Sequence, residues 1–181
     1  MVPRAFEDVS DFRKAELPDA GGSGGGSRSL DDEQQEVVIH FYRLGDPYGW
    51  MSNFSKHPVL LDEREWPTVE HYYQAMKVTG ADQEAVRLAK SPGNAKRLAW
   101  ATPLRSDWEE VRDSVMLEAL RAKFSQHPDL GEALISTGNA KLVERTSNDS
   151  YWGDGGDGTG RNRLGELLML VRSEIGQTAG G

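Results

Sequence analysis

The amino-acid sequence predicts a mainly α-helical, α+β protein, a single compact helical domain with a small β element near its N-terminal end. Two observations predict this class. Apolar residues recur at helical spacing through most of residues 68–175, and a β-branched and aromatic run precedes them at residues 37–42. A chain of 181 residues is long enough for one domain and a tail, but too short for two ordinary domains.

Composition excludes several classes of function. The chain has no cysteine, so a disulfide framework, a Cys-ligated metal site and a thiolate nucleophile are excluded. The formal net charge is −8, which argues against a protein that binds nucleic acid mainly through its phosphates. Residues 1–36 carry nine acidic and four basic side chains, which leaves only −3 on the other 145 residues. A small anion is therefore an acceptable partner for the folded part.

The chain divides into three segments. Residues 1–36 are predicted to form a disordered, acidic, Gly/Ser-rich tail, because the run 21–27 has no side chains to bury. Residues 37–176 are predicted to fold, and residues 177–181 to form a disordered C-terminus. No signal-peptide pattern and no apolar run of about 18 residues is present, so we expect a cytoplasmic protein without membrane contact. The oligomeric state stays open.

The first elements follow from local patterns. Residues 37–42 predict a strand, and the acidic turn Asp62-Glu63 between two apolar runs predicts a small hairpin. After Pro67, Thr68 is expected to cap a helix over 68–78. Its core-facing stripe is Val69, Tyr72, Tyr73 and Met76.

Four more start signals and a final stripe predict the remaining helices. Asp82 is expected to cap the second helix, and Ser91-Pro92 to open a third that ends near Trp100. A capping box of Ser106 and Glu109 predicts the longest helix, over about 107–124. Pro128 begins a short helix that ends near residue 138, and apolar residues over 164–175 predict the last one.

One candidate site lies on the helix predicted over 68–78. Glu70, Gln74 and Lys77 fall on one stripe of that helix, and Tyr73 borders the stripe. A carboxylate, an amide and an ammonium would thus follow a wall edged with aromatic rings. The alternative is a solvated face with ordinary i+3 and i+4 contacts.

A second candidate is the glycine-rich segment 150–162. Five glycines in eight residues let the backbone approach a ligand, and the segment leads into a helix N-terminus suited to phosphate. Asp154 and Asp157 would repel an anion, which Arg161 and Arg163 partly offset. The spacing matches neither the P-loop nor the Rossmann pattern, and a plain connector is the alternative.

A third candidate is the aromatic turn 48–54. Aromatic faces suit a planar heterocycle, and the Asn53 side chain suits ribose hydroxyls; a satellite aromatic cluster is the alternative. The four histidines show no metal-ligand spacing, so no metal is expected. We expect His71 to be a cap or surface residue, and Lys96 and Lys123 to be surface charges.

Several motifs in these segments resemble the YbiA-like (NADAR) family. They are Met51–Phe54, Trp66–Ala75, Leu120–Phe124, Tyr151–Gly156 and Gly160–Gly165. The resemblance runs in order from about residue 38 to 175 and so covers essentially the whole predicted domain.

The resemblance implies a mainly α fold and a hydrolase of N-glycosidic bonds that needs no cofactor. The expected substrate is a small phosphoribosyl amino-pyrimidine of riboflavin biosynthesis, cleaved to ribose 5-phosphate and the free pyrimidine. The alternative is binding or processing of ADP-ribose, including its removal from nucleic-acid bases. By the matching motif Glu70 is the catalytic carboxylate. The expected substrate-binding residues are Asn53, Phe54, Tyr73, Gln74, Lys77, Trp152, Gly153, Gly155, Gly156, Arg161 and Asn162.

Breaking an N-glycosidic bond builds positive charge on the anomeric carbon. Glu70 would stabilise that charge and orient or deprotonate water. Asp154 or a water would protonate the leaving nitrogen, and Trp152 and Tyr73 would stack on the heterocycle. Lys77, Arg161 or backbone N–H groups would hold the 5-phosphate.

Overall fold

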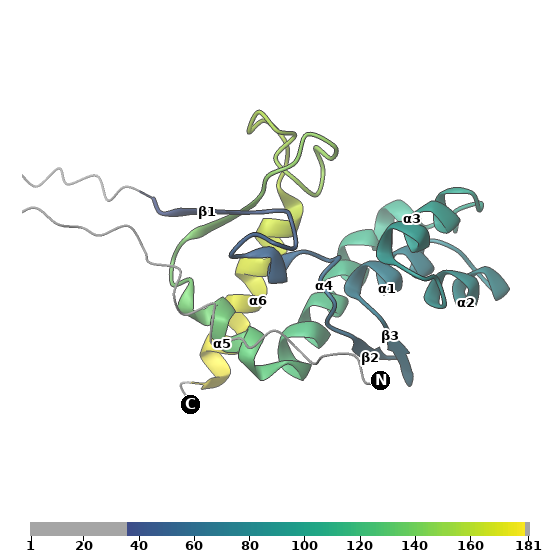
Figure 1. The fold of residues 1–181 in the computed structure, drawn as a ribbon, viewed down its shortest axis with the longest axis horizontal. Coiled ribbons are helices and arrows are strands. Elements are labelled where there is room, and N and C mark those ends of the chain that lie inside the picture. The colour runs from purple at the N-terminus through teal and green to yellow at the C-terminus, as the bar shows by residue number, and fades with distance from the viewer. Residues whose placement is uncertain (1–35, 180–181) are drawn as a thin grey trace, which may run out of the picture.

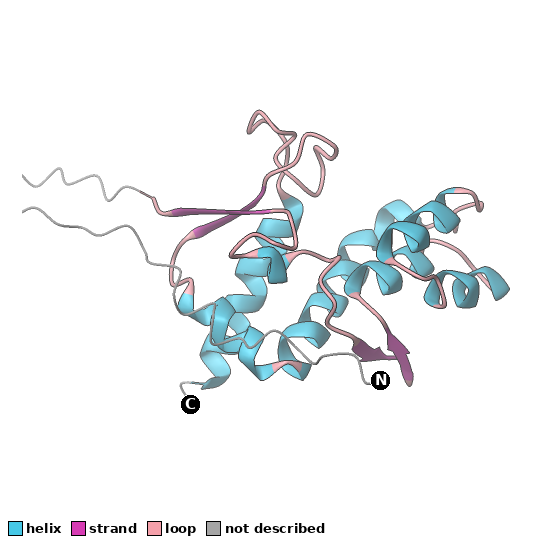
Figure 2. Cartoon of the chain, viewed as in Figure 1, coloured by secondary structure: helices cyan, strands magenta, loops and turns pink. Residues whose placement is uncertain are grey.

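Helices are the main regular elements of the structure, a computed structural model that describes residues 36–179 (Figures 1 and 2). The mainly α, α+β prediction is confirmed, while the tail predicted before Glu36 lies outside the described residues. In chain order the elements are β1 (Val38–Phe41), the 3-10 turn η2 (Gly49–Met51), β2 (Val59–Leu61), β3 (Arg64–Trp66), α1 (Val69–Met76), α2 (Ala81–Arg87), α3 (Pro92–Trp100), α4 (Trp108–Gln126), α5 (Pro128–Ser136), β4 (Lys141–Glu144) and α6 (Arg163–Ala179).

Helix α4 organises the packing because it contacts elements on both sides of the molecule. It packs against α1 and β2 on one side and against α5 and α6 on the other. Helices α2 and α3 cover α1, so the three form one end of the molecule in Figure 1. The core runs through all of these contacts and includes the fully buried side chains of Trp66, Met116 and Leu168.

Within residues 36–179 the β structure consists of two separate pairs of strands. β2 and β3 form the predicted hairpin, in which Asp62 and Glu63 have φ of 52° and 59°. Two successive residues with positive φ are what a two-residue type I′ hairpin turn requires. β1 pairs in parallel with β4, with Phe41 opposite Glu144.

Strand β4 is absent from the sequence-based prediction. Its four residues, Lys141–Glu144, are too few to show an alternating pattern, and its partner β1 lies about 100 residues earlier in the chain. The strand brings the segment that follows it, residues 145–162, to the upper edge of the molecule in Figure 1, above the start of α6.

Two helix caps are as predicted. The Thr68 Oγ1 accepts a hydrogen bond from the His71 backbone N–H (3.3 Å), and the Ser91 Oγ accepts one from the Asn94 N–H (3.2 Å). The imidazole of His71 is buried rather than on the surface, and its two nitrogens contact Thr68 Oγ1 and the Ala89 carbonyl. His71 therefore ties α1 to the segment after α2.

Two other predicted caps are wrong. Helix α2 begins at Ala81, and Gly80 with φ of 64° precedes it, so Asp82 lies inside the first turn. The capping box predicted for Ser106 and Glu109 does not form, because helix α4 begins at Trp108 with Asp107 as its cap residue, and Asp107 makes no side-chain cap hydrogen bond. The Asp107 carboxylate instead pairs with the Arg105 guanidinium (2.6 Å).

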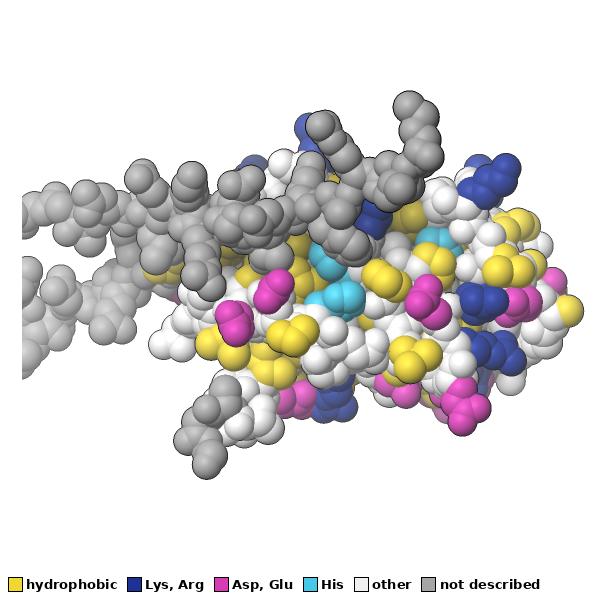
Figure 3. Space-filling view, turned by 60° about the horizontal axis from the view of Figure 1, so that its bottom comes forward, with side chains coloured by type: hydrophobic (Ala, Val, Ile, Leu, Met, Phe, Trp, Pro, Cys, Tyr) yellow, Lys and Arg dark blue, Asp and Glu magenta, His cyan; other side chains and the backbone are white. Residues whose placement is uncertain are grey.

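At the C-terminal end, α6 continues to Ala179, three residues beyond the predicted domain boundary at residue 176. No helix within residues 36–179 is long and apolar enough to cross a membrane. On the face shown in Figure 3, basic and acidic side chains are interspersed between apolar ones.

Candidate active site

Helix α1 carries the central carboxylate into the interior. Glu70 and Gln74 are 5% and 2% exposed, and the Gln74 Nε2 donates a hydrogen bond of 2.7 Å to the Glu70 Oε1. The predicted stripe is therefore real, but it does not form the solvated face considered as its alternative. Burial of a carboxylate with a single amide donor costs free energy, and groups of this kind are concentrated at functional sites.

The electrostatic surroundings of Glu70 act in both directions. Burial raises the pKa of its carboxyl above the ordinary value, while the Gln74 hydrogen bond and the charges of Lys96 and Lys77 oppose the rise. The nearby Asp149 raises the pKa further. Helices α1 and α3 and the loop after β4 thus place their charged groups around one carboxylate.

The segment 50–55 is held beside α1 by Lys123. This lysine is fully buried, so the expectation of a surface charge is wrong. Its Nζ donates hydrogen bonds to the carbonyls of Trp50 (2.6 Å) and Ser52 (3.1 Å) and to the Ser55 Oγ (2.7 Å). Burial lowers the pKa of Lys123 to about 7. The segment held in this way includes Asn53.

Asn53 joins that segment to helix α1. Its carbonyl accepts a hydrogen bond from the Glu70 backbone N–H (3.0 Å), and its Nδ2 donates to the Met116 Sδ (3.4 Å). The buried Asn53 Oδ1 and Gln74 Oε1 have no hydrogen-bond partner within residues 36–179. Buried acceptors of this kind are rare unless a ligand or water satisfies them. Two such acceptors suit the hydroxyl groups of a sugar.

An aromatic wall completes this side of the site. The Trp152 Nε1 donates to the Tyr73 hydroxyl (3.1 Å), and the two rings meet edge to face at 5.4 Å. Trp108 also lies against Tyr73, at 5.1 Å between ring centres. The Lys77 ammonium lies 4.7 Å from the centre of the Tyr73 ring. Burial lowers the pKa of Lys77.

The glycine-rich segment is shaped by two polar side chains. The Asp154 Oδ1 accepts hydrogen bonds from the backbone N–H groups of Thr146 (3.0 Å) and Gly156 (2.9 Å). Asn162, with φ of 51°, accepts from the Glu144 N–H (2.9 Å) and donates to the Leu142 carbonyl (2.8 Å). These contacts are within the fold, so both residues position the loop and strand β4.

The glycines of this segment permit close backbone approach. A Cβ on Gly153 would lie 2.4 Å from the Thr146 Cγ2, and Gly155 and Gly156 have φ of 73° and 84°.

Two further predicted binding residues lie nearer the surface. Phe54 is half-buried beside Asn53, and Arg161 is exposed, with its guanidinium 5.4 Å from the Tyr151 ring.

The expected phosphate site at the N-terminus of α6 is not available. The backbone N–H groups of Arg163 and Leu164 donate to the carbonyls of Tyr151 and Trp152, at 3.0 and 3.1 Å. The loop therefore folds back and takes the donors that an anion would need.

Three groups in the site were not selected from the sequence. Glu144 ends β4, Asp149 follows it in the loop, and Lys96 projects from α3; all three influence the charge of Glu70 or of each other. Burial raises the pKa of Glu144 to about 7. Of these three groups, only Asp149 had a local signal in the sequence, as an acidic residue two positions before Tyr151-Trp152. Glu144 and Lys96 reach the site only through tertiary packing.

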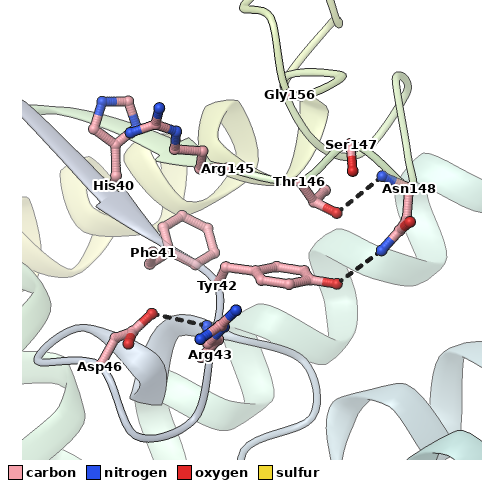
Figure 4. A pocket seen from close by; sticks show the side chains of 10 residues that line it. All are labelled: His40, Phe41, Tyr42, Arg43, Asp46, Arg145, Thr146, Ser147, Asn148 and Gly156. Carbon is pink, nitrogen blue, oxygen red and sulfur yellow. Dashed lines mark hydrogen bonds between the residues drawn. The ribbon is translucent and has the colours of Figure 1, made fainter.

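A cavity of about 420 Å³ opens on the other side of the end of β4 (Figure 4). Arg145 contributes to it, together with His40, Arg43 and Asp46, all of them exposed. Neighbouring residues of a strand point to opposite faces, so Arg145 lies on the face opposite Glu144. Gly156 is the only residue that this cavity shares with the predicted site. Within residues 36–179, no group of three His, Cys, Asp or Glu side chains could hold a metal ion.

Comparison with known proteins decides the family. The NADAR domain model matches residues 40–176. The chain belongs to the NADAR family. N-glycosidase YbiA of Escherichia coli is 49% identical over 144 residues, which cover 78% of this chain and 90% of the relative.

Two further comparisons agree with that assignment. The NMR structure of E. coli YbiA superposes with a TM-score of 0.74 at 47% identity, covering 80% of this chain and 88% of that one. A maize chloroplastic protein named riboflavin biosynthesis protein PYRR is 41% identical over 76% of this chain and 25% of its own length. By these matches the NADAR-family chain is an enzyme, an N-glycosidase.

Proposed function

We propose that this NADAR-family N-glycosidase hydrolyses phosphoribosyl amino-pyrimidines, the early intermediates of riboflavin biosynthesis, to ribose 5-phosphate and the free pyrimidine. The observation that carries the proposal is the buried Glu70, held by Gln74 beside two unsatisfied acceptors and an aromatic wall. The name of the maize relative, a riboflavin biosynthesis protein, supports the same substrate class.

Glu70 is proposed as the group that stabilises the reacting sugar carbon. Positive charge develops on the anomeric carbon as the nitrogen leaves, and a carboxylate in a water-poor site stabilises it strongly. The same carboxylate accepts a proton from the attacking water. Gln74 supports this role because its N–H bond to Oε1 fixes the direction of the carboxylate.

The other parts of the substrate match the remaining groups. The acceptor atoms of Asn53 and Gln74 are proposed to take hydrogen bonds from the ribose hydroxyls. Tyr73 and Trp152 are proposed to contact the pyrimidine, since flat rings pack well on aromatic side chains. Lys77 and Lys96 have no ion-pair partner in the described part of the chain, and they are proposed to hold the 5-phosphate.

Processing of ADP-ribose is the second candidate function. It would use the same carboxylate and aromatic wall, because the bond broken is also an N-glycosidic bond to ribose. Removal of ADP-ribose from nucleic acid would in addition require a basic path beside the site. Residues 37–181 carry a formal net charge of only −3, and this near-neutral balance favours the small-molecule substrate.

A substrate panel tests the proposal. Wild-type protein is incubated with a phosphoribosyl amino-pyrimidine, with ADP-ribose and with an ADP-ribosylated guanine nucleotide, and released sugar phosphate and free base are quantified. We expect release of ribose 5-phosphate from the first compound at the highest kcat/KM. Turnover of the ADP-ribosylated nucleotide alone would contradict the proposed substrate and favour the second candidate.

A further inference from the structure

A second carboxylate faces the site from strand β4. The backbone of Glu144 is fixed on both sides, since its N–H donates to the Asn162 Oδ1 and its carbonyl accepts from the Asp154 N–H (2.9 Å each). In the β1–β4 pairing its neighbour is Phe41, whose side chain lies in the core. Glu144 therefore lies on the same side of the strand pair as Phe41, and Glu70 on α1 is among the charged groups close enough to influence its carboxyl.

The charged groups around Glu144 come from three elements. Asp149 and Asp154 lie on the loop after β4, Glu70 on α1, and Lys96 on α3. Helix α6 also packs against β4, but its first arginine, Arg163, pairs with Asp113 and Glu166 instead. Three of the four charged neighbours are acidic, so the surroundings disfavour a negative charge on Glu144.

Glu144 differs from the acidic residues of the following loop, Asp149 and Asp154, in its hydrogen bonding. Asp154 and Asp149 each use Oδ1 to accept two backbone N–H bonds. Within residues 36–179 the Glu144 carboxyl forms no ion pair, and no side-chain hydrogen bond is among the influences on its pKa. A carboxyl that is free of protein partners, and beside three acidic groups, is suited to carry a proton that a substrate will take.

We propose that Glu144 is the proton donor to the leaving nitrogen and works as a pair with Glu70. This inference rests on the proposed substrate, a phosphoribosyl amino-pyrimidine, and replaces Asp154 as the acid. An exocyclic amine leaves poorly as an anion, so it has to receive a proton as the C1′–N bond breaks.

The two carboxyl groups together balance the reaction. As the C1′–N bond breaks, its electron pair stays on nitrogen, which takes the proton of Glu144. Water adds to C1′ and gives one proton to the ionised Glu70. Return of that proton to Glu144 restores both groups, and two carboxyl groups that influence each other's charge are expected to titrate as a coupled pair. Burial raises the pKa of Glu144 to about 7 and keeps much of it protonated in neutral solution.

The test compares leaving groups that do and do not need a proton. Nicotinamide riboside 5-phosphate, a pyridinium nucleotide, loses a neutral nitrogen base without protonation, whereas the phosphoribosyl amino-pyrimidine needs it. The kcat of wild type, Glu144→Gln and Glu144→Asp is measured with both compounds from pH 5 to 9. Glu132→Gln, an exposed glutamate on α5, is the matched control.

We expect Glu144→Gln to lower kcat on the amino-pyrimidine about 100-fold or more, with a much smaller loss on the pyridinium compound. Glu144→Asp should recover part of the activity. In wild type the amino-pyrimidine rate should fall as the pH rises above about 7, and this fall should be absent in Glu144→Gln.

Two results would overturn the assignment. One is wild-type-like turnover of the amino-pyrimidine by a folded Glu144→Gln protein. The other is a wild-type rate on the amino-pyrimidine that does not fall above pH 7, a result that needs no variant at all. Failure of the proposed function is a separate outcome, because wild-type protein would then release no ribose 5-phosphate from the amino-pyrimidine. In that case the same comparison of variants would be made with the amine N-glycoside that the protein does cleave.

Discussion

Glu70 illustrates which parts of a site are local in the chain. Its contact with Gln74 is an i,i+4 pair, so helical spacing alone placed the carboxylate and the amide on one stripe. Burial of that stripe was not predictable in the same way. It depends on α3, α4 and the segment 50–55 packing over α1, and those contacts join distant parts of the sequence.

Gln74 provides a residue-scale prediction. Gln74→Glu keeps the shape but replaces the N–H donor to Glu70 with a second carboxylate. We expect kcat at pH 8 to fall about 10- to 100-fold, in keeping with the loss of a hydrogen bond to a charged group. Activity should recover in part as the pH is lowered, because the introduced carboxyl can donate a hydrogen bond to Glu70 once it is protonated. A pH series of kcat checks this.

The control for that change is Gln177→Glu on the exposed part of α6, which should leave kcat unaltered. If Gln74→Glu and the control behave alike at every pH, the Gln74 amide has no part in holding Glu70.

At the scale of elements, the helices were predictable and strand β4 was not. Helix starts at Thr68 and Ser91 followed from capping side chains that act on the next three residues. Strand β4 exists because it pairs with β1 and because Asn162 holds both Leu142 and Glu144. The missing strand is the reason that Glu144 was absent from the residues selected by sequence.

Asn162 provides the element-scale prediction. Asn162→Ala removes an acceptor for the Glu144 N–H and a donor to the Leu142 carbonyl, both partly or fully buried. We expect the free energy of unfolding to fall by about 2–4 kcal/mol. Asn162→Asp keeps the acceptor and should lose less. Urea denaturation measures both values, and equal stability of Asn162→Ala and wild type would contradict the role of this bridge.

At the scale of the whole molecule, composition and pattern predicted a single mainly helical domain, and the structure has that architecture. The net charge of the chain was less informative about the site. An excess of acidic residues over the chain does not reveal that Lys77, Lys96, Glu70 and Glu144 meet in one site. A cluster of this kind has consequences for stability as well as for chemistry.

The stability of the whole protein should depend on pH through Glu144. Its pKa is raised from 4.5 to about 7 on folding, so the folded protein holds this proton more tightly than the unfolded chain. The contribution of Glu144 to stability is thus complete below about pH 4.5 and is lost as the pH rises toward 7. We expect Glu144→Gln to be more stable than wild type at pH 8 but not at pH 4.5. Thermal melts at both pH values test this, and an equal difference at the two would contradict it.

The most direct test of the account is the single-turnover rate of Glu70→Gln with saturating phosphoribosyl amino-pyrimidine, measured beside its substrate dissociation constant. The account predicts that binding stays within a few-fold of wild type while the rate of ribose 5-phosphate release falls at least about 100-fold. A wild-type rate in a folded Glu70→Gln protein would contradict it, because the carboxylate on α1 would then not be the group that acts on the sugar carbon.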